Sequence, residues 1–394
     1  MGVKVKEIYY RIQTEIGHDI ELVAGKDGMS NVVSLFHVVE GPEITTFLEG
    51  QELIMTTGIA LGDGPQELFD IVKLCLEKKA SAMIINIGPH IKSVSPEVIQ
   101  FANDNAFPLF ICPWHVYMAH IMKIVTDEIA KSEARKIELI SAFKNAICFP
   151  SQPELSIPQI ERYDYDPEWN YCIAIIKIKK KESGQEADRE TLRAMRKSIE
   201  TALLFNAPES MTFRLQSELV ICFAHRLESS IIQAMNLVLD HISLPYKKTY
   251  DLYIGIGRNT KSIRCLSKTY RIANKVAKLQ ETLEHSYEVL SYKDLSFTKL
   301  FLSMDDQEIA HEYYDHVLRP LVEYDEINHT DFVDFLEIYF LENCSVQETA
   351  DHLFLHRNSI NYKLKKIDDI LQCDLNDFNT KVELAIALKL RYLF

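Results

Sequence analysis

Basic side chains gather near the end of the chain, in the segment TADHLFLHRNSINYKLKKI (residues 349–367). No acidic residue stands between Asp351 and Asp368. The basic residues in that interval are Arg357, Lys363, Lys365 and Lys366. The whole chain carries a formal net charge of −14 at pH 7, which opposes non-specific binding to a polyanion. Any contact with nucleic acid therefore has to be local, and an ordinary solvated helix face is the alternative explanation of this segment.

The same segment has the apolar spacing of two short helices joined by a turn, FLH. The residues that share a helical face are Val346, Ala350 and Leu353 before the turn and Ile360, Leu364 and Ile367 after it. Small Ala350 lets two helices cross closely, and we expect Leu355 in the turn to close their shared core. This pattern predicts a helix-turn-helix over residues 345–367, whose second helix can enter the DNA major groove. An ordinary helical hairpin has the same spacing, and Phe354 stands where such turns usually carry glycine.

The outer face of the second helix follows from the helical repeat. At ~100° per residue, Asn358, Tyr362 and Lys366 lie opposite the apolar residues. Asparagine can bond adenine edges, lysine neutralises phosphate, and Arg357 stands at the helix start, where recognition helices usually contact bases. The residues that we expect to contact DNA are Arg357, Asn358, Ser359, Asn361, Tyr362, Lys363, Lys365 and Lys366. Among them, Lys363 and Lys366 are expected to contact phosphate.

Residues 20–115 have the pattern of an α/β unit. Short β-rich runs end at glycines in IELVAG, VVSLFHVVEG and ELIMTTG. A helical pattern over residues 65–80, the apolar strand AMIINIG, the helical pattern SPEVIQFANDN and the strand PLFICPW then follow. This alternation predicts parallel strands with right-handed crossovers. The segment contains neither GxGxxG nor a GxxxxGK motif followed by Ser or Thr, so neither a dinucleotide site nor a P-loop is indicated.

Polar and aromatic residues follow three of these predicted strands. Ligands of open parallel sheets bind beyond the carboxyl ends of the strands, so we expect an effector there. The candidate effector-binding residues are Thr56, Thr57 and Gly58 after the first strand, Asn86, Gly88 and His90 around the second, and Pro113, Trp114 and His115 after the third. Trp114 offers a flat face on which a planar metabolite could stack. Each residue also has an ordinary structural explanation, such as a strand cap, a turn glycine or a core tryptophan.

The rest of the chain divides at a predicted linker. A long helix is predicted from Val116 to Ile147, and it either pairs with its twin in a dimer or packs on its own domain. FPSQPELSIPQ (residues 149–159) then has the proline and serine content of a linker. Strand, hairpin and helix patterns after it predict a small α+β sheet domain. Residues 301–344 hold twelve acidic residues and one basic residue, Arg319, which sets them apart from the balanced segment that follows.

The composition fits a multidomain globular protein. A chain of 394 residues is expected to form two to four domains. Its eight cysteines include no CxxC pair, which favours reduced thiols, and His115 and His120 form no ligand-like cluster, so neither a metal site nor a cofactor is expected. The N-terminal residues lack the apolar core of a signal peptide, and no apolar run approaches the ~20 residues of a bilayer span. We therefore expect a cytoplasmic protein without membrane contact.

Several of these segments also resemble a known family. From Ser345 onward, SVQETADHLFLHRNSINYKLKKIDDILQCDLNDFNTKVELAIALKLR closely resembles the C-terminal helix-turn-helix of PucR/CdaR-type bacterial transcription regulators. Residues 20–130, with GQELIMTTG and FPLFICPW, resemble the PucR-type N-terminal domain of purine-catabolism regulators. Residues 170–290, with YIGIGR and SIRCLSKTYRIANKVAKL, resemble the degenerate GGDEF-type middle domain of the same family.

The resemblance implies a multidomain chain of the α/β, α+β and all-α classes. Its expected parts are a PucR-type α/β sensor domain (1–130), a linking helix and linker (116–158), a ferredoxin-like or GGDEF-like domain (159–292) and a helical C-terminal domain (293–394). It further implies a regulator that binds double-stranded promoter DNA in response to a small molecule, such as a purine catabolite, an amino acid or a sugar acid. Because one helix-turn-helix contacts few base pairs, we expect a homodimer or higher oligomer. In GMSNVV, Asn31 stands where the family pattern has arginine.

A nucleotide cyclase is the competing hypothesis, because the middle domain resembles one in fold. Cyclase hairpins carry a Gly-Gly-Asp/Glu-Glu-Phe turn, in which the glycines admit the substrate and the carboxylates hold metal. The equivalent residues here are Leu215, Gln216, Ser217, Glu218 and Leu219. Both glycines are replaced and one carboxylate remains, which is too few for a two-metal phosphoryl-transfer site. The sequence therefore predicts a transcription regulator without catalytic activity.

Overall fold

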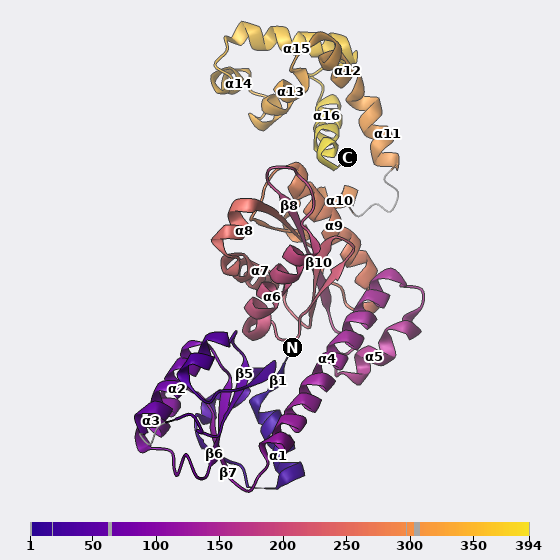
Figure 1. The fold of residues 1–394 in the computed structure, drawn as a ribbon. Coiled ribbons are helices and arrows are strands. Elements are labelled where there is room, and N and C mark those ends of the chain that lie inside the picture. Colours follow the sequence, from indigo (N-terminus) through magenta and orange to yellow (C-terminus); the bar gives the residue numbers. More distant parts are fainter. Residues whose placement is uncertain (1, 18, 62–64, 297, 303–307, 394) are drawn as a thin grey trace. The chain divides into compact units, whose positions relative to one another are not determined.

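The computed structural model describes residues 2–17, 19–61, 65–296, 298–302 and 308–393. The chain divides into two compact units, Met1–Ser141 and Ala142–Phe394 (Figure 1). The first is built on a five-stranded sheet, and the second combines another five-stranded sheet with a set of helices. Within the described residues, no helix has the length and apolar character needed to cross a membrane.

The sheet of the first unit has the strand order β2-β7-β6-β5-β4. Its strands are β2 (Glu21–Ala24), β4 (Leu35–Val38), β5 (Glu52–Thr56), β6 (Ala82–Ile87) and β7 (Leu109–Pro113). Strands β4 to β7 are parallel, and β2 pairs antiparallel with β7. The predicted parallel arrangement is confirmed for ELIMTTG, AMIINIG and PLFICPW, whereas IELVAG supplies an antiparallel edge strand.

Helices cover both faces of this sheet. Those on one face are α2 (Pro65–Glu77) and α3 (Pro96–Asp104), and those on the other are α1 (Val5–Ile16) and α4 (Met118–Cys148). Side chains of β5 alternate between the two cores, with Ile54 facing α2 and α3 and with Leu53 and Met55 facing α1 and α4. The short elements are β1 (Val3–Lys4), which pairs with β3 (Val32–Val33), and the 3-10 helices η1 (Lys26–Ser30) and η2 (Pro42–Phe47).

Helix α4 confirms the long helix predicted from the apolar spacing. Its first part buries Ile121, Ile124 and Val125 in the core of the first unit. Its last turns lie in the second unit, where the ring of Phe143 lies 5.5 Å from that of Tyr165. Between these two stretches, Ile137 is 67% exposed. The helix therefore packs within the first unit at its start and within the second unit at its end. Dimer formation through its middle turns stays a prediction.

The second sheet lies in the middle of the chain, with the order β12-β11-β8-β10-β9. Its strands are β8 (Tyr171–Lys180), β9 (Met211–Leu215), β10 (Glu218–Ala224), β11 (Tyr250–Ile256) and β12 (Val289–Ser291). All neighbouring pairs are antiparallel except β11 and β12. This mixed sheet with helices confirms the α+β prediction for the middle of the chain. The predicted linker carries the 3-10 helix η3 (Pro153–Leu155) and the start of α5 (Ile157–Arg162).

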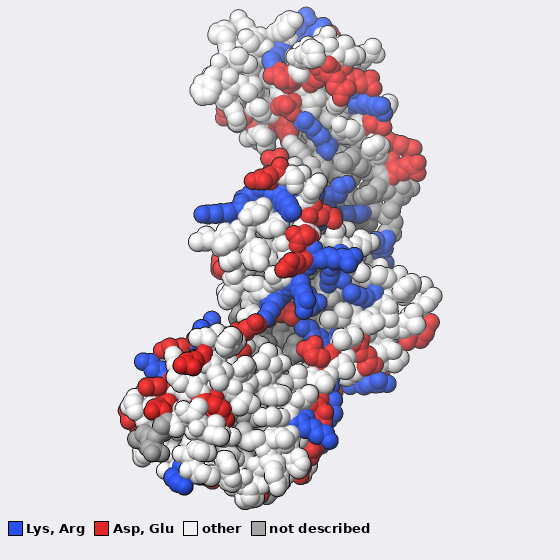
Figure 2. Space-filling model, viewed as in Figure 1, with Lys and Arg blue, Asp and Glu red and all other residues white. Residues whose placement is uncertain are grey.

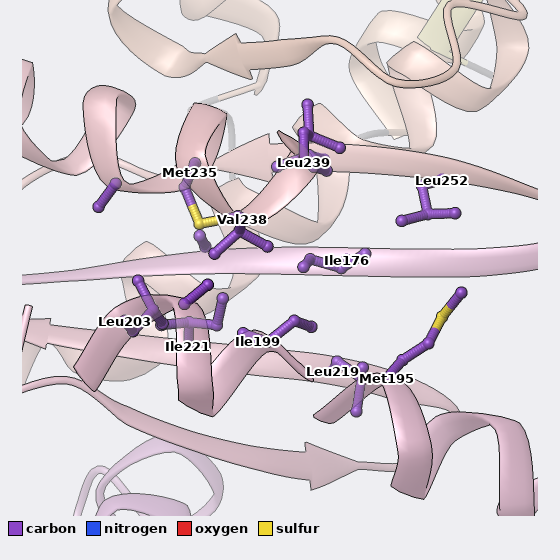
Figure 3. Packing of buried hydrophobic residues seen from close by; sticks show 14 of the residues in the cluster. Ile176, Met195, Ile199, Leu203, Leu219, Ile221, Met235, Val238, Leu239 and Leu252 are labelled. Carbon is purple, nitrogen blue, oxygen red and sulfur yellow. The ribbon is translucent and has the colours of Figure 1, made fainter. Parts of the chain in front are cut away.

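Three long helices build the middle domain around its sheet. Helices α6 (Arg189–Asn206) and α7 (Glu228–His241) pack on one face, where Met195, Ile199 and Val238 meet Ile176 and Ile221 of the strands (Figure 3). Helix α9 (Leu266–Thr282) packs against β8 and β11. The shorter elements are α8 (Leu244–Thr249), η4 (Ile263–Cys265) and η5 (Tyr292–Asp294).

The C-terminal part of the second unit is helical, as predicted. Its helices are α10 (Thr298–Leu302), α11 (Glu308–Val317), α12 (Arg319–Asn328), α13 (Phe332–Leu341), α14 (Val346–His352), α15 (Arg357–Leu371) and α16 (Phe378–Leu390), followed by η6 (Arg391–Leu393). Their shared core includes Leu321, Leu336, Ile360 and Ile367, none of which is measurably exposed. From residue 308 onward, the acidic segment thus forms α11 to α13, and α12 and α13 help to bury the apolar side of α15.

Candidate DNA-binding surface and effector site

Helices α14 and α15 form the predicted helix-turn-helix. Ser345 caps α14, since its Oγ accepts a hydrogen bond from the backbone N–H of Glu348 at 3.3 Å. The turn is closed by the N–H of Leu355, which donates to the carbonyl oxygen of Ala350 at 2.9 Å. Phe354 has φ +54°, the left-handed conformation that favours glycine, and its side chain is 95% exposed. Phe354, which stands where such turns usually carry glycine, is therefore the residue at which the turn needs a positive φ.

One prediction about this motif is wrong. Leu355 is 40% exposed and does not close the core between the two helices. The turn directs it outward, and α12, α13 and α16 supply the apolar side chains that cover α14 and α15. Sequence reasoning confined to residues 345–367 missed these helices as packing partners.

The structure places six of the eight predicted DNA-contacting residues at the exposed side of α15. These are Arg357, Asn358, Ser359, Asn361, Tyr362 and Lys365. The opposite side of the helix buries Ile360 and Ile367. Tyr362 is 68% exposed. The exposed set is one that could contact DNA, because it combines amide, hydroxyl and cationic groups along a single surface.

Lys363 and Lys366 differ from these six, because both are half-buried. The Nζ of Lys363 lies 2.5 Å from Oδ1 of Asp331, and 5.1 Å and 5.6 Å from the ring centroids of Phe335 and Phe332. The Nζ of Lys366 lies 5.7 Å from the ring centroid of Tyr324. Both cations are therefore directed at α12 and α13, and Lys365 is the exposed lysine of this helix.

Acidic residues are frequent on α11 to α13, and Figure 2 shows them along α11 and α12. Several have structural partners. Asp325 accepts hydrogen bonds from the backbone N–H groups of Phe332 and Val333 at 2.9 Å and 2.8 Å, so it caps α13. Asp334 lies 2.7 Å from Arg391. The acidic segment thus stabilises helix ends and neighbouring cations in the C-terminal domain.

The candidate effector residues lie at the edge formed by the carboxyl ends of β5, β6 and β7, as predicted. At β5, however, the groups of Thr56, Thr57 and Gly58 already have a partner, the carboxylate of Glu40. Sequence reasoning missed Glu40, although it is the residue before the final glycine of the β-rich run VVSLFHVVEG and could have been noticed as an acidic residue at a strand end.

The residues after β6 and β7 meet each other. A side chain on Gly88 would lie 2.4 Å from the ring of Trp114, so the glycine allows the indole to pack directly on the backbone. The ring centroid of His90 lies 6.1 Å from that of Trp114, in an edge-on arrangement. Trp114 is 49% exposed, which excludes the core-filling explanation for this tryptophan. Its indole could therefore stack on a ligand.

The remaining candidates at this edge have mostly structural contacts. Asn86 is buried and donates from Nδ2 to the carbonyl oxygens of Cys112 and Pro113, at 3.3 Å and 3.2 Å. Burial raises the pKa of the Cys112 thiol to about 11, so the thiol is neutral at pH 7. The Nε2 of His115 lies 3.4 Å from Asp19, and the histidine is exposed. Asn31 donates to the carbonyl oxygen of Ser81, which precedes β6, and so lies at the opposite edge of the sheet.

The hairpin that would hold a cyclase site lies between β9 and β10. Gln216 and Ser217 form its turn, and Glu218 is buried. The carboxylate of Glu218 accepts a hydrogen bond from Tyr270 at 2.8 Å and lies 3.8 Å from the Nζ of Lys177. Across the described parts of the chain, no cluster of three or more His, Cys, Asp or Glu residues could hold a metal ion. The one carboxylate that remains at the cyclase position, that of Glu218, therefore contacts Tyr270 and Lys177 of the same chain.

Comparisons with known proteins match three segments of the chain. Residues 12–129 match the purine catabolism regulatory protein-like family, PucR. Residues 153–279 match the GGDEF-like domain, and residues 332–390 match the PucR C-terminal helix-turn-helix domain. In these three segments the chain is similar to the PucR family of transcription regulators. The family resemblance predicted for all three segments is confirmed.

Three curated relatives come from Bacillus subtilis. The proline-responsive transcriptional activator PutR is 27% identical over 69% of this chain and 66% of its own length. The DNA-binding transcriptional activator AdeR is 27% identical over 37% of this chain and 35% of its own length. The purine catabolism regulatory protein is 25% identical over 30% of this chain and 22% of its own length. The chain thus aligns with two thirds of one relative and about a third or less of the others.

The contacts of Lys363 lead to a prediction about stability. We expect Lys363→Ala to lower the free energy of unfolding of the C-terminal domain by about 1–2 kcal/mol, because it removes an ion pair and two cation–π contacts. The exposed Lys365→Ala is the matched control and should change it by less than about 0.5 kcal/mol. Thermal unfolding of both variants checks this, and equal stability of the two would contradict the structural role of Lys363.

Proposed function

We propose that this protein is a transcription regulator that binds operator DNA through α15 and responds to a small-molecule effector bound by its N-terminal domain. The observation that supports DNA binding best is the arrangement of α15. Its apolar side is buried by α12, α13 and α14, while Arg357, Asn358, Asn361, Tyr362 and Lys365 lie on its exposed surface. A helix held in this way can enter the major groove without losing its own packing.

The exposed residues divide by chemistry into two groups. Arg357 and Asn358 lie in the first turn of α15, and guanidinium and amide groups can form paired hydrogen bonds with base edges. Lys365 carries a mobile ammonium group that suits phosphate. We assign base recognition to the first group and phosphate contact to Lys365. Lys363 and Lys366 support the helix from its flank and would reach phosphate only if they left Asp331 and Tyr324.

The effector is proposed to bind at the carboxyl edge of the β5-β6-β7 sheet. Exposed Trp114, with Gly88 and His90 beside it, offers a surface for a small polar, planar metabolite. The names of two relatives point to different signals, proline and purine catabolism. A purine catabolite, an amino acid and a sugar acid therefore remain the chemical classes to test, and binding would act by shifting α4 between two arrangements.

We further propose that the regulator works in the cytoplasm as a homodimer or a higher oligomer. One α15 reads only a few base pairs, and symmetry doubles the site. The middle turns of α4, with exposed Ile137, and the middle domain are the proposed contact surfaces.

The DNA-binding proposal predicts two kinds of mutant. Arg357→Ala or Asn358→Ala should cost about 1–3 kcal/mol at particular base pairs and should relax specificity there. Lys365→Ala should weaken binding to all sequences and lower the salt slope by about one, because one phosphate contact is lost. Fluorescence anisotropy with operator fragments at several salt concentrations measures both. Unchanged affinity in a folded Arg357→Ala, Lys365→Ala double mutant would exclude α15 as the recognition helix.

The effector proposal predicts a ligand response that depends on Trp114. A thermal-shift screen of the three metabolite classes on the full chain should find a compound that raises the unfolding midpoint. Trp114→Ala should abolish that rise, because the stacking surface is lost. Tyr10→Ala, which removes another exposed aromatic side chain from the same unit, should leave it unchanged. An identical ligand response in both variants would place the effector elsewhere.

The oligomer proposal predicts that the molar mass of the complex is a multiple of the 45.5 kDa chain. Two copies should occupy half-sites about one helical turn apart, roughly 34 Å, or a multiple of it. Light scattering at micromolar concentration, with and without operator DNA, measures this mass. A monomer that binds DNA tightly and singly would refute the proposal.

A further inference from the structure

The carboxylate of Glu40 occupies a ring of hydrogen-bond donors at the carboxyl end of β5. Its Oε1 accepts from the N–H of Thr57 at 3.0 Å and from the hydroxyl of the same residue at 2.9 Å. Its Oε2 accepts from the N–H groups of Gly58 and Ile59, at 2.9 Å and 3.2 Å, and from the hydroxyl of Thr56 at 3.3 Å. Three backbone N–H groups and two hydroxyls thus converge on one carboxylate.

The backbone of this segment explains why the donors converge. Gly58 has φ +74°, and a residue in this conformation turns successive N–H groups to the same side of the chain. Such a concave set of N–H groups binds anions. A side chain at position 58 would lie 2.5 Å from Ile91, so glycine is also required by close packing. We call the donors of Thr56, Thr57, Gly58 and Ile59 the carboxylate nest.

Glu40 reaches the carboxylate nest from the outermost strand of the sheet. It follows β4, the edge strand, and β4 pairs with β5 on one side. The next residue, Gly41, has no atom within 4 Å of the position that a side chain would take. The space beside Gly41 is therefore open, whereas the residue before Glu40, Val39, is buried. A second carboxylate would receive the same hydrogen bonds, so the exchange would leave no donor unsatisfied.

The nest is connected to Trp114 through packed residues. Gly58 contacts Ile91, and the carbonyl oxygen of Ile91 accepts a hydrogen bond from the N–H of Gly88 at 2.8 Å. Gly88 in turn lies against the indole of Trp114. A ligand whose carboxylate replaced that of Glu40 would thus lie on the same edge as the half-exposed indole.

We propose that the carboxylate nest is the binding site for the carboxylate of a small-molecule carboxylic acid, and that Glu40 is a tethered occupant which this acid displaces. The proposal deepens the effector proposal above and rests on it. Because a tethered group has an effective concentration of roughly millimolar or more, a bare carboxylate competes poorly with Glu40. An effector displaces Glu40 by adding contacts through the rest of its structure, and its binding releases the Glu40 side chain from the nest.

Chemical rescue with acetate tests the nest in the full-length protein. Glu40→Ala should lower the midpoint of thermal unfolding of the N-terminal unit by several degrees, because the donors lose their acceptor. Sodium acetate should restore the midpoint in a saturable manner, whereas sodium chloride at equal ionic strength should not. The wild-type protein and Glu43→Ala, which removes a nearby exposed carboxylate, should respond equally to the two salts. An equal response of Glu40→Ala to both salts would overturn the proposal.

Glu40→Gln provides a second variant if Glu40→Ala does not fold. Glutamine keeps the shape of glutamate but directs its own N–H₂ donor at the nest, so the nest should again become open to acetate. Selective [15N]glycine labelling then follows the amide of Gly58, whose signal should move in Glu40→Gln and return toward its wild-type position with acetate. A Gly58 signal that ignores acetate would overturn the proposal.

Operator binding is measured separately on the same samples. Rescue by acetate in a protein that does not bind DNA would refute the proposed function and leave the carboxylate site standing. Operator binding without rescue by acetate would refute the carboxylate site and leave the proposed DNA-binding function standing.

Discussion

The burial of one side of α15 determines the geometry of the C-terminal domain. Ile360 and Ile367 are fully buried among α12, α13, α14 and α16, and this packing fixes the rotation of the helix about its axis. Each buried aliphatic side chain contributes about 1.5–3 kcal/mol, so a rotated helix would be strongly disfavoured. The side presented to solvent is the consequence of this packing, and it carries Asn358, Tyr362 and Lys365. A surface that recognises DNA requires such a fixed rotation, because base edges differ over distances of a few ångströms.

Charge in this region serves stability as well as recognition. Lys363 belongs to the basic cluster of the sequence, yet its ammonium group lies between Asp331 and the rings of Phe332 and Phe335. The exposed lysine of this helix, Lys365, has no such partner among the interactions of the described residues. Neighbouring lysines on one helix therefore have different roles, which depend on the helices that flank each of them.

A different constraint organises the N-terminal unit. Four parallel strands bring their carboxyl ends to one edge, where the chain leaves the sheet and backbone N–H groups lose their strand partners. At β5, Glu40 satisfies these groups, and at β6 and β7 a glycine lets Trp114 lie on the backbone. At this edge, backbone N–H groups therefore lack partners within the sheet. The groups that could bind a ligand lie at the same edge.

Elements whose signals are local could be predicted from the sequence. Apolar spacing located α4, α14 and α15, and short β-rich runs located most strands of the first sheet. The motif around Arg357 indicated the family resemblance. Tertiary structure alone decided the partners of individual side chains. Leu355 points outward because α12, α13 and α16 fill the core, and Glu40 meets Thr57 because β4 and β5 are neighbours in the sheet. Such pairings depend on packing between segments far apart in the chain, and local spacing carries no information about them.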